Sequence, residues 1–385
     1  MAWHGLVGDQ ATAERFAQMA EAGFTHSLGW QRAEAVQQTA DSARSAGVSL
    51  IVRVPVKRHD LAATEAALAP VVEAMKGHPA VAGYFIVDEP GAEAFDALAE
   101  LVARLRRIDP DKLFYINLLP TYASPKHQLQ AQTYEQYVRL FLQKVPVQVL
   151  SFDHYPVSTK GLSKDFYLNL EIISRLAVEH RLSFWAFALS TPHFSFPAPT
   201  LGHLRLQQYS NLAYGAQGLQ YFTYTTPRGE DFRPGPLDRE LNPTATYELV
   251  RQVNQELQAR AWVFMGSQVL SVGHVGEPLP EGTRLYEPAE PVQSVRVEGK
   301  GAVVSLLANG DRRHLVIVNR DHESPARLKV AWASGTAMQE VGPQGKATPL
   351  AGDSLERPLE AGDACILVWG AGPSGRATGP DPARP

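Results

Sequence analysis

Residues 82–90 read AGYFIVDEP, an apolar run that ends on two adjacent acids and a proline. The apolar part is typical of a buried strand of a parallel sheet. The acids Asp88 and Glu89, with Pro90, could start a helix, because an acid near the N-cap and a proline at N1 both favour helix initiation. A helical pattern follows, with basic residues in its last turns, and it stops at Pro110. The stretch therefore predicts one strand–helix unit.

Strand-like runs and amphipathic helical runs alternate over about the first 260 residues. Residues 11–23 are an example of the helical runs, since Phe16, Met19 and Ala20 fall on one face. The runs that predict strands are 3–8, 26–30, 49–56, 82–90, 113–120, 147–157, 182–190 and 218–227. No glycine-rich phosphate-binding pattern follows the first of them, which argues against an open dinucleotide-binding sheet. The eight units predict an α/β fold, a closed (β/α)8 TIM barrel.

The pattern changes after a long helical run at 242–264. Short alternating strands then follow, separated by glycine, proline and charged residues, and the pair around ANGD (308–311) predicts a hairpin. We therefore expect a barrel domain over 1–262 and a small antiparallel β-sandwich over 263–370. The Gly/Pro-rich residues 371–385 predict a disordered tail.

The composition of the chain restricts the kinds of partner that we expect it to bind. A net charge of −4 and a charged content of 20% give no basic surface for nucleic acid or an anionic membrane. No apolar run approaches the ~18 residues of a transmembrane helix. A single cysteine, Cys365, excludes an intramolecular disulfide and a cysteine-rich metal site. We expect no cofactor and no signal peptide in the given chain. A cytoplasmic location and secretion with the leader removed both stay open, as does the oligomeric state.

The active site of such a barrel lies at the carboxyl ends of its strands. The acids at those ends, and so the candidate catalytic residues, are Asp88, Glu89 and Asp153. The candidate substrate-binding residues are Trp30, Arg53, Asn117, His154, Tyr155, Trp185, His193 and Tyr224. Aromatic faces suit the C–H surfaces of a sugar, polar groups suit its hydroxyls, and acids suit the glycosidic bond. This mixture predicts an oligosaccharide or glycoside as substrate.

Several of these residues also have a purely structural interpretation. His154 could be a satisfied core histidine, and Trp185 could fill the barrel interior. Arg53 could pair with Asp88 as charge compensation.

A metal site is the weaker hypothesis. It would gather His26, His154 and His193 with Asp88 or Glu89, and would predict a metal-dependent sugar isomerase or lyase. No HExxH-like spacing supports it, so we assign no metal ligand.

The barrel part of the chain resembles the clan A glycoside hydrolases, which include β-galactosidases and cellulases. Members carry Asn-Glu-Pro after the fourth strand, where this chain has DEP at 88–90. DHYP at 153–156 is loosely similar to the aromatic motif after their sixth strand, and GLQYFTYTTP at 218–227 to their aromatic sugar platform. The long helix followed by a β domain is similar to the β-galactosidase layout. The resemblance implies a glycoside hydrolase in which Glu89 is the general acid/base.

The seventh strand departs from that pattern. Residues 182–193 read LSFWAFALSTPH and hold no acid, where clan A places its nucleophilic Glu. Retaining hydrolysis needs a second carboxyl group about 5 Å from the first. Asp153 is the first choice for it, and Glu230 or Asp231 the second. A wider separation would imply inversion, and the lack of any partner would imply a catalytically inactive carbohydrate-binding protein.

Overall fold

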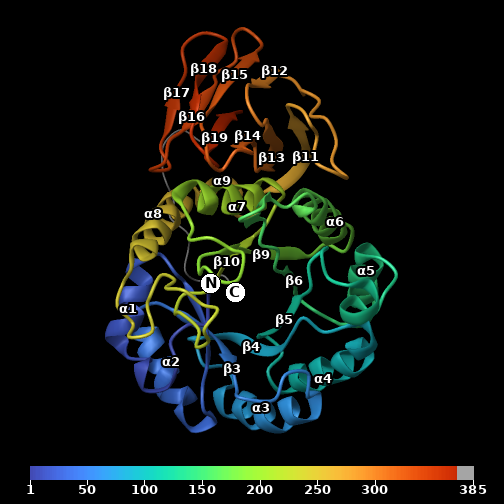
Figure 1. Ribbon diagram of the computed structural model, residues 1–385, viewed down its shortest axis with the longest axis vertical. Helices are drawn as coiled ribbons and strands as arrows, with labels where there is room; N and C mark the ends of the chain where they lie inside the picture. Colours follow the sequence, from blue (N-terminus) through green and yellow to red (C-terminus); the bar gives the residue numbers. More distant parts are fainter. Residues whose placement is uncertain (371–385) are drawn as a thin grey trace.

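The computed structural model describes residues 1–370, and its first part is a closed barrel of eight parallel strands. Figure 1 looks into this barrel, whose strands are joined in the order β1-β10-β9-β6-β5-β4-β3-β2. The strands are β1 (Ala2–Trp3), β2 (His26–Trp30), β3 (Ser49–Arg53), β4 (Val81–Asp88), β5 (Leu113–Leu118), β6 (Val149–Phe152), β9 (Ser183–Leu189) and β10 (Gly218–Phe222). Each lies within or overlaps one of the eight predicted runs, so the TIM-barrel prediction is confirmed.

Helices surround the barrel on the outside (Figure 1). They are α1 (Ala13–Glu21), α2 (Val36–Ser45), α3 (Leu61–Met75), α4 (Phe95–Ile108), α5 (Tyr134–Lys144), α6 (Phe166–Glu179), α7 (Leu201–Ala213), α8 (Ala245–Ala259) and α9 (Ala261–Phe264). Short helical turns lie at Gly8–Gln10, Ala33–Ala35, Ala92–Ala94 and Pro125–Leu129. Thr12 shows how local sequence starts a helix, because its side chain accepts a hydrogen bond from the backbone of Arg15 at the beginning of α1. No helix within residues 1–370 combines the length and the apolar character needed to cross a membrane.

The barrel interior is a packed core. Trp3 lies with its ring centre 5.5 Å from that of Phe85 and 5.3 Å from that of Phe187. Beside them the buried Tyr115 hydroxyl donates to Gln220 Oε1 and lies 2.7 Å from Ser151 Oγ. These hydrogen bonds lie deeper in the barrel than the carboxyl ends of the strands. They help to fix the core on which the side chains at those ends pack.

The C-terminal part folds as two packed antiparallel sheets, which confirms the predicted sandwich. Six strands form one sheet: β11 (Gln268–Val275), β13 (Ala302–Asn309), β14 (Arg312–Asn319), β19 (Ala364–Trp369), β16 (Gln339–Val341) and β17 (Ala347–Pro349). Three form the other: β12 (Val292–Val297), β15 (Ala326–Trp332) and β18 (Ser354–Leu359). The predicted hairpin at ANGD joins β13 to β14, with Gly310 at a φ of 57°. The predicted disordered tail lies outside the described residues.

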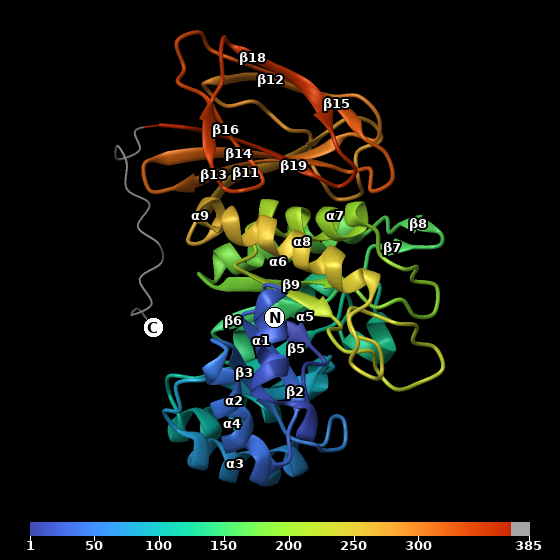
Figure 2. The same ribbon diagram turned by 90° about the vertical axis from the view of Figure 1, so that its left-hand side faces the viewer.

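The six-stranded sheet faces the barrel, and Figure 2 shows it lying over α7, α8 and α9. Helix α7 is consequently covered on two sides, by the barrel strand β9 and by β13 and β14, and ten of its thirteen residues are buried. Arg260, which is 4% exposed, joins the two parts: its Nη1 donates to the Tyr209 hydroxyl at 2.6 Å, and its Nε donates to the Gly342 carbonyl at 3.1 Å. The barrel and the sandwich therefore share a buried polar interface.

Candidate active site

Glu89 occupies a constrained turn directly after β4. Its backbone N–H donates to the Asn117 carbonyl at 2.8 Å, and its φ is 48°, in the left-handed region that residues other than glycine rarely adopt. The next residue, Pro90, is held by the buried Tyr137 hydroxyl, which donates to its carbonyl at 2.7 Å. Strain of this kind is typical of functional sites and requires surrounding contacts that enforce it.

The two acids do not cap the helix that follows them. The helical turn begins at Ala92, its N-cap is Gly91, and the Glu93 N–H in its first turn donates to Gln130 Oε1 at 3.3 Å, not to either acid. The helix-initiation interpretation of DEP is therefore wrong for the side chains of Asp88 and Glu89. The carboxylates of Asp88 and Glu89 therefore contact side chains outside this helix.

Asn117, at the end of β5, connects two of the candidate acids. Its Nδ2 donates to Asp153 Oδ1 at 2.7 Å and lies 3.4 Å from Asp88 Oδ1. The Ser151 hydroxyl donates to Asn117 Oδ1 at 3.0 Å, which orients the amide. Because both carboxylate oxygens approach one nitrogen, they can be no more than about 6 Å apart, in the range of paired carboxyl groups in glycosidases.

A loop after β3 supplies the cation of the site. Arg58 Nη2 lies 2.6 Å from Glu89 Oε2 and 3.9 Å from Asp88 Oδ2. The neighbouring His59 has its Nε2 2.9 Å from the Asp88 backbone carbonyl. Neither Arg58 nor His59 is among the candidates expected from the sequence, because both lie in the loop beyond the end of β3. The signal that could have found them is the basic run KRHD at 57–60, next to a strand whose neighbour ends in two acids.

The three acids have different surroundings and therefore different proton affinities. Burial, then the charges of Glu89 and Asp88, hold the pKa of Asp153 well above its usual range. Burial and Asp88 also raise the pKa of Glu89, but the Arg58 guanidinium opposes the rise. Burial raises the pKa of Asp88, and the charges of Arg58 and Arg53 oppose it. Asp153 is the acid best able to keep a proton at neutral pH.

Arg53 is held by aromatic faces. Its guanidinium carbon lies 3.8 Å from the ring centre of Trp30 and 4.4 Å from that of Phe85. Burial lowers its pKa to about 10, so it stays charged at neutral pH. Within residues 1–370 no carboxylate lies within 4.0 Å of it, so the expected structural pair with Asp88 does not form. A cation on aromatic faces is positioned to receive a ligand.

Aromatic rings cover the opposite side of the mouth. The ring of His193 lies 5.4 Å from Phe222 and 5.1 Å from Phe232, centre to centre. Tyr155 lies 5.5 Å from Phe222 and 5.9 Å from Phe196. Of these rings, those of Tyr155 and His193 belong to the substrate-binding candidates expected from the sequence. The mouth therefore has acids on one side and an aromatic wall on the other.

His154 does not belong to the mouth. Its side chain is fully buried and lies with Nε2 3.3 Å from Asp165 Oδ1, against the exposed Tyr122 ring. Successive residues of an extended chain point to opposite sides, so His154 faces away when Asp153 faces inward. Its structural interpretation is the correct one.

Trp185 and Tyr224 are also placed elsewhere. Trp185 is the third residue of β9 and lies with His26, at the start of β2, beside a cavity of about 340 Å³ at the amino ends of the strands. Tyr224 is fully buried against Phe24, whose ring centre lies 5.1 Å away. We therefore leave His154, Trp185 and Tyr224 out of the site.

The histidines of the metal hypothesis do not converge. His26 lies at the amino end of the barrel, His154 faces Asp165, and His193 has its Nδ1 2.9 Å from the Thr191 carbonyl. The ligand set that would support an isomerase or lyase is therefore not assembled.

The end of β9 carries no acid. Leu189 is its last residue, and the Ser190 hydroxyl that follows donates to the Thr223 carbonyl at 2.7 Å. Glu230 and Asp231 are exposed in the loop after β10. Of the candidates for the second carboxyl group, Asp153 is the one that Asn117 links to Asp88.

The barrel, the sandwich and the acids at the carboxyl ends of the strands define a (β/α)8 protein with a C-terminal β-sandwich, and solved structures share this fold. No protein-family model and no curated protein sequence matches the chain. A glycoside hydrolase is similar over 96% of this chain and 92% of its own, with a TM-score of 0.57 and 10% identity. A glycoside hydrolase family 5 protein from Bacteroides vulgatus has the same TM-score and identity over 96% and 88%.

Two further structures are similar. An α-amylase from Geobacillus thermoleovorans covers 92% of this chain and 90% of its own, with a TM-score of 0.55 and 10% identity. A β-galactosidase from Marinomonas ef1 matches with a TM-score of 0.49 and 13% identity over 68% of this chain, which spans 60% of that protein. At these identities the likeness establishes a fold shared with glycoside hydrolases.

Proposed function

We propose that this protein hydrolyses a glycosidic bond at the mouth of its barrel, with Glu89, Asp153 and Asp88 as the catalytic acids. One observation carries the proposal: the Asn117 amide joins the carboxylates of Asp88 and Asp153, its carbonyl accepts the Glu89 N–H, and Arg58 contacts Asp88 and Glu89 but not Asp153. Neighbouring carboxyl groups in unequal surroundings are the means by which glycosidases divide acid and base roles.

The electrostatics divide those roles. Asp153 is buried, has no cation in contact, and supplies the proton that the departing glycosidic oxygen requires. Glu89, whose side chain is 26% exposed and paired with Arg58, is the ionised carboxylate that attacks the anomeric carbon or activates a water. This assignment keeps the pair expected from the sequence but moves the resting proton from Glu89 to Asp153. Asp88 adds negative charge that helps to keep the proton on Asp153.

Arg53 and the aromatic wall are the substrate-binding part of the proposal. The Arg53 donors, held flat between Trp30 and Phe85, would bind sugar hydroxyls or the carboxylate of an acidic sugar. Tyr155, His193 and Asn117 would contact the rest of an oligosaccharide or glycoside. The proposal names no particular sugar.

The test compares variants on a panel of aryl glycosides and polysaccharides. We expect Glu89→Gln and Asp153→Asn each to lower kcat/KM by about 10²–10⁴-fold. A dinitrophenyl leaving group needs no proton, so Asp153→Asn should regain activity on dinitrophenyl glycosides and Glu89→Gln should not. The matched control is Glu93→Gln, an exposed acid of the same loop, which should behave as the unmodified protein. Unchanged hydrolysis in Glu89→Gln would refute the assignment.

A second candidate is a carbohydrate-binding protein without hydrolytic activity. The lack of an acid at the end of β9 and the Arg58 ion pair on Glu89 favour it. It predicts calorimetric binding of oligosaccharides that is retained in Glu89→Gln, with no reducing ends released from any substrate. Release of reducing ends that depends on Glu89 excludes it.

A further inference from the structure

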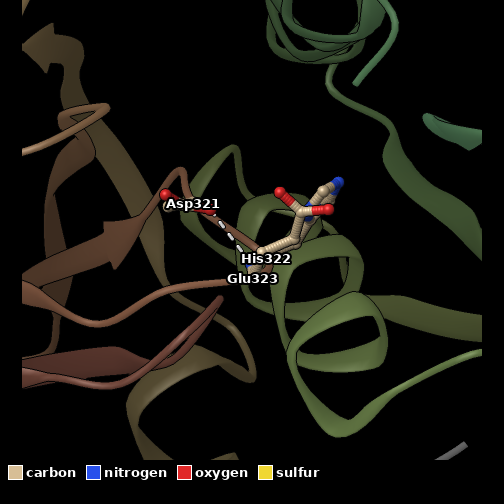
Figure 3. Close-up of side chains that lie close together, drawn as sticks. All are labelled: Asp321, His322 and Glu323. Carbon is tan, nitrogen blue, oxygen red and sulfur yellow. Dashed lines mark hydrogen bonds between the residues drawn. The ribbon is translucent and has the colours of Figure 1, made fainter. Parts of the chain in front are cut away.

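A cluster of potential metal ligands lies far from the barrel mouth, in the loop between β14 and β15. Asp321, His322 and Glu323 are consecutive, and one ligand atom from each lies within 4.8 Å of the other two. Figure 3 shows the Glu323 carboxylate beside the His322 imidazole, with Asp321 on the other side of the turn. Within residues 1–370 this is the group of histidine and acidic side chains close enough to hold one ion.

His322 gives the independent reason to expect a ligand. The residue is 6% exposed, and neither of its ring nitrogens has a hydrogen-bond partner among the described residues. A buried imidazole normally satisfies at least one nitrogen, and an ion is one of the standard explanations when it does not. The ring of His203 on α7 lies 4.9 Å away, centre to centre. A second imidazole, from the barrel, therefore faces the first, from the sandwich.

The charges suit a cation. The buried His322 imidazole has both ring nitrogens without a hydrogen-bond partner among the described residues, so a nitrogen is available to an ion beside the two carboxylates. Asp321 is already oriented, because its Oδ1 accepts the backbone N–H groups of Glu323 at 3.0 Å and Ser324 at 3.3 Å. Held in this way, Asp321 needs little reorganisation to bind an ion.

Lys300 at present neutralises these acids. Its ammonium lies 3.0 Å from Asp321 Oδ1 and 3.4 Å from Glu323 Oε2, and its side chain is 58% exposed. An exposed lysine on a flexible stem can move into solvent when a divalent ion replaces it. Lys300 is therefore a competitor for the same carboxylates.

We propose that Asp321, His322 and Glu323 bind a divalent transition-metal ion such as zinc, and that His203 on α7, whose ring centre lies 4.9 Å from that of His322, turns its imidazole to become the fourth ligand. Imidazole nitrogens and carboxylate oxygens are zinc's ordinary ligands. Because His203 belongs to the barrel and the other three belong to the sandwich, the ion would clamp the two parts together. Its role is structural and independent of the acids in the mouth.

The test uses the full chain, dialysed against a chelator and titrated with zinc in competition with a chromophoric chelator. We expect one zinc per chain and a higher thermal midpoint with zinc than without. Glu323→Gln and His203→Gln should each weaken zinc binding at least tenfold, while His127→Gln, an exposed histidine elsewhere, should leave it unchanged. Lys300→Gln should tighten it, since it removes the competing cation.

Two outcomes overturn the proposal: zinc affinity that is equal in the unmodified chain and in Glu323→Gln, or weaker binding in Lys300→Gln. The Glu323 side chain is 65% exposed, so Glu323→Gln should fold like the unmodified chain, and circular dichroism of both proteins checks this. Every readout is metal content or affinity, so the outcome does not depend on whether the mouth hydrolyses sugars.

Discussion

Replacing Asp153 with asparagine should make the protein more stable while it removes activity. In the unfolded chain this aspartate ionises with a pKa near 3.9. In the folded chain burial and the charges of Glu89 and Asp88 raise its pKa well above that value. Folding at neutral pH therefore requires either burial of a charge or uptake of a proton, and asparagine requires neither. Its carbonyl can still accept the hydrogen bond that Asn117 now donates to Asp153 Oδ1 at 2.7 Å.

The size of the effect follows from proton linkage. The native state binds one more proton than the unfolded state at every pH between the two pKa values of Asp153. Stability therefore falls as pH rises through that interval, by up to about 1.4 kcal/mol per pH unit. Asp153→Asn removes this contribution, and we expect it to raise the free energy of unfolding at pH 7 by roughly 1–3 kcal/mol.

The assay is urea unfolding at pH 5, 6, 7 and 8, with the gain in stability plotted against pH. The gain should grow with pH until the folded pKa is passed. Asp165→Asn is a control of opposite sign: burial alone would raise the pKa of Asp165, but bonds from His154, Ser163 and Thr121 outweigh it and lower the pKa. That variant should be less stable by a nearly constant amount from pH 5 to 8, because a lowered folded pKa makes the deficit shrink only below the unfolded pKa near 3.9. A gain for Asp153→Asn that is constant or shrinks with rising pH would refute the reasoning.

Two further predictions concern the turn that carries the acids. Arg58→Gln removes the cation that opposes the raised pKa of Glu89, so the acid limb of the pH–activity profile should move to higher pH. The exposed pair itself should contribute less than about 1 kcal/mol, and an unmoved acid limb would show that Glu89 is not the ionised group. Tyr137→Phe leaves the buried Pro90 carbonyl without its donor and should cost roughly 1–2 kcal/mol. Differential scanning calorimetry should show a lower midpoint, and an equal one would show that Tyr137 does not hold the turn.

The strands were predictable because a barrel strand buries both faces and so reads as a short apolar run between helical patterns. The same apolar run does not indicate how far along the barrel axis a given residue lies. Trp185 faces the interior, but it is the third residue of β9 and lies near the amino ends of the strands. Position along the axis depends on strand tilt and register, which involve all eight strands. Trp185 was expected either to bind substrate or to fill the barrel, and its position near the amino ends of the strands agrees with barrel filling.

Other errors have other physical causes. His154 could have been excluded by the alternation of side chains next to Asp153. Tyr224 could not, because it lies beyond the end of β10, where alternation no longer applies, and its backbone N–H donates to the Trp3 carbonyl. Arg58 and His59 were missed because a loop folds them back towards acids about thirty residues away, a contact that no local pattern records. Asp88, Glu89 and Asp153 could be selected as candidates from the sequence because each comes at the end of a strand.

Helix α7 has a consequence for how the chain can be divided. A typical barrel helix turns one face to solvent, but this one is enclosed by β9 and by the sheet of the sandwich. A fragment ending near residue 262 would expose the outer face of α7 and leave the Arg260 donors without the carbonyls of Val341 and Gly342. The sandwich therefore covers part of the hydrophobic core of the barrel. A truncation that removes the sandwich would remove part of the hydrophobic interior on which the barrel depends.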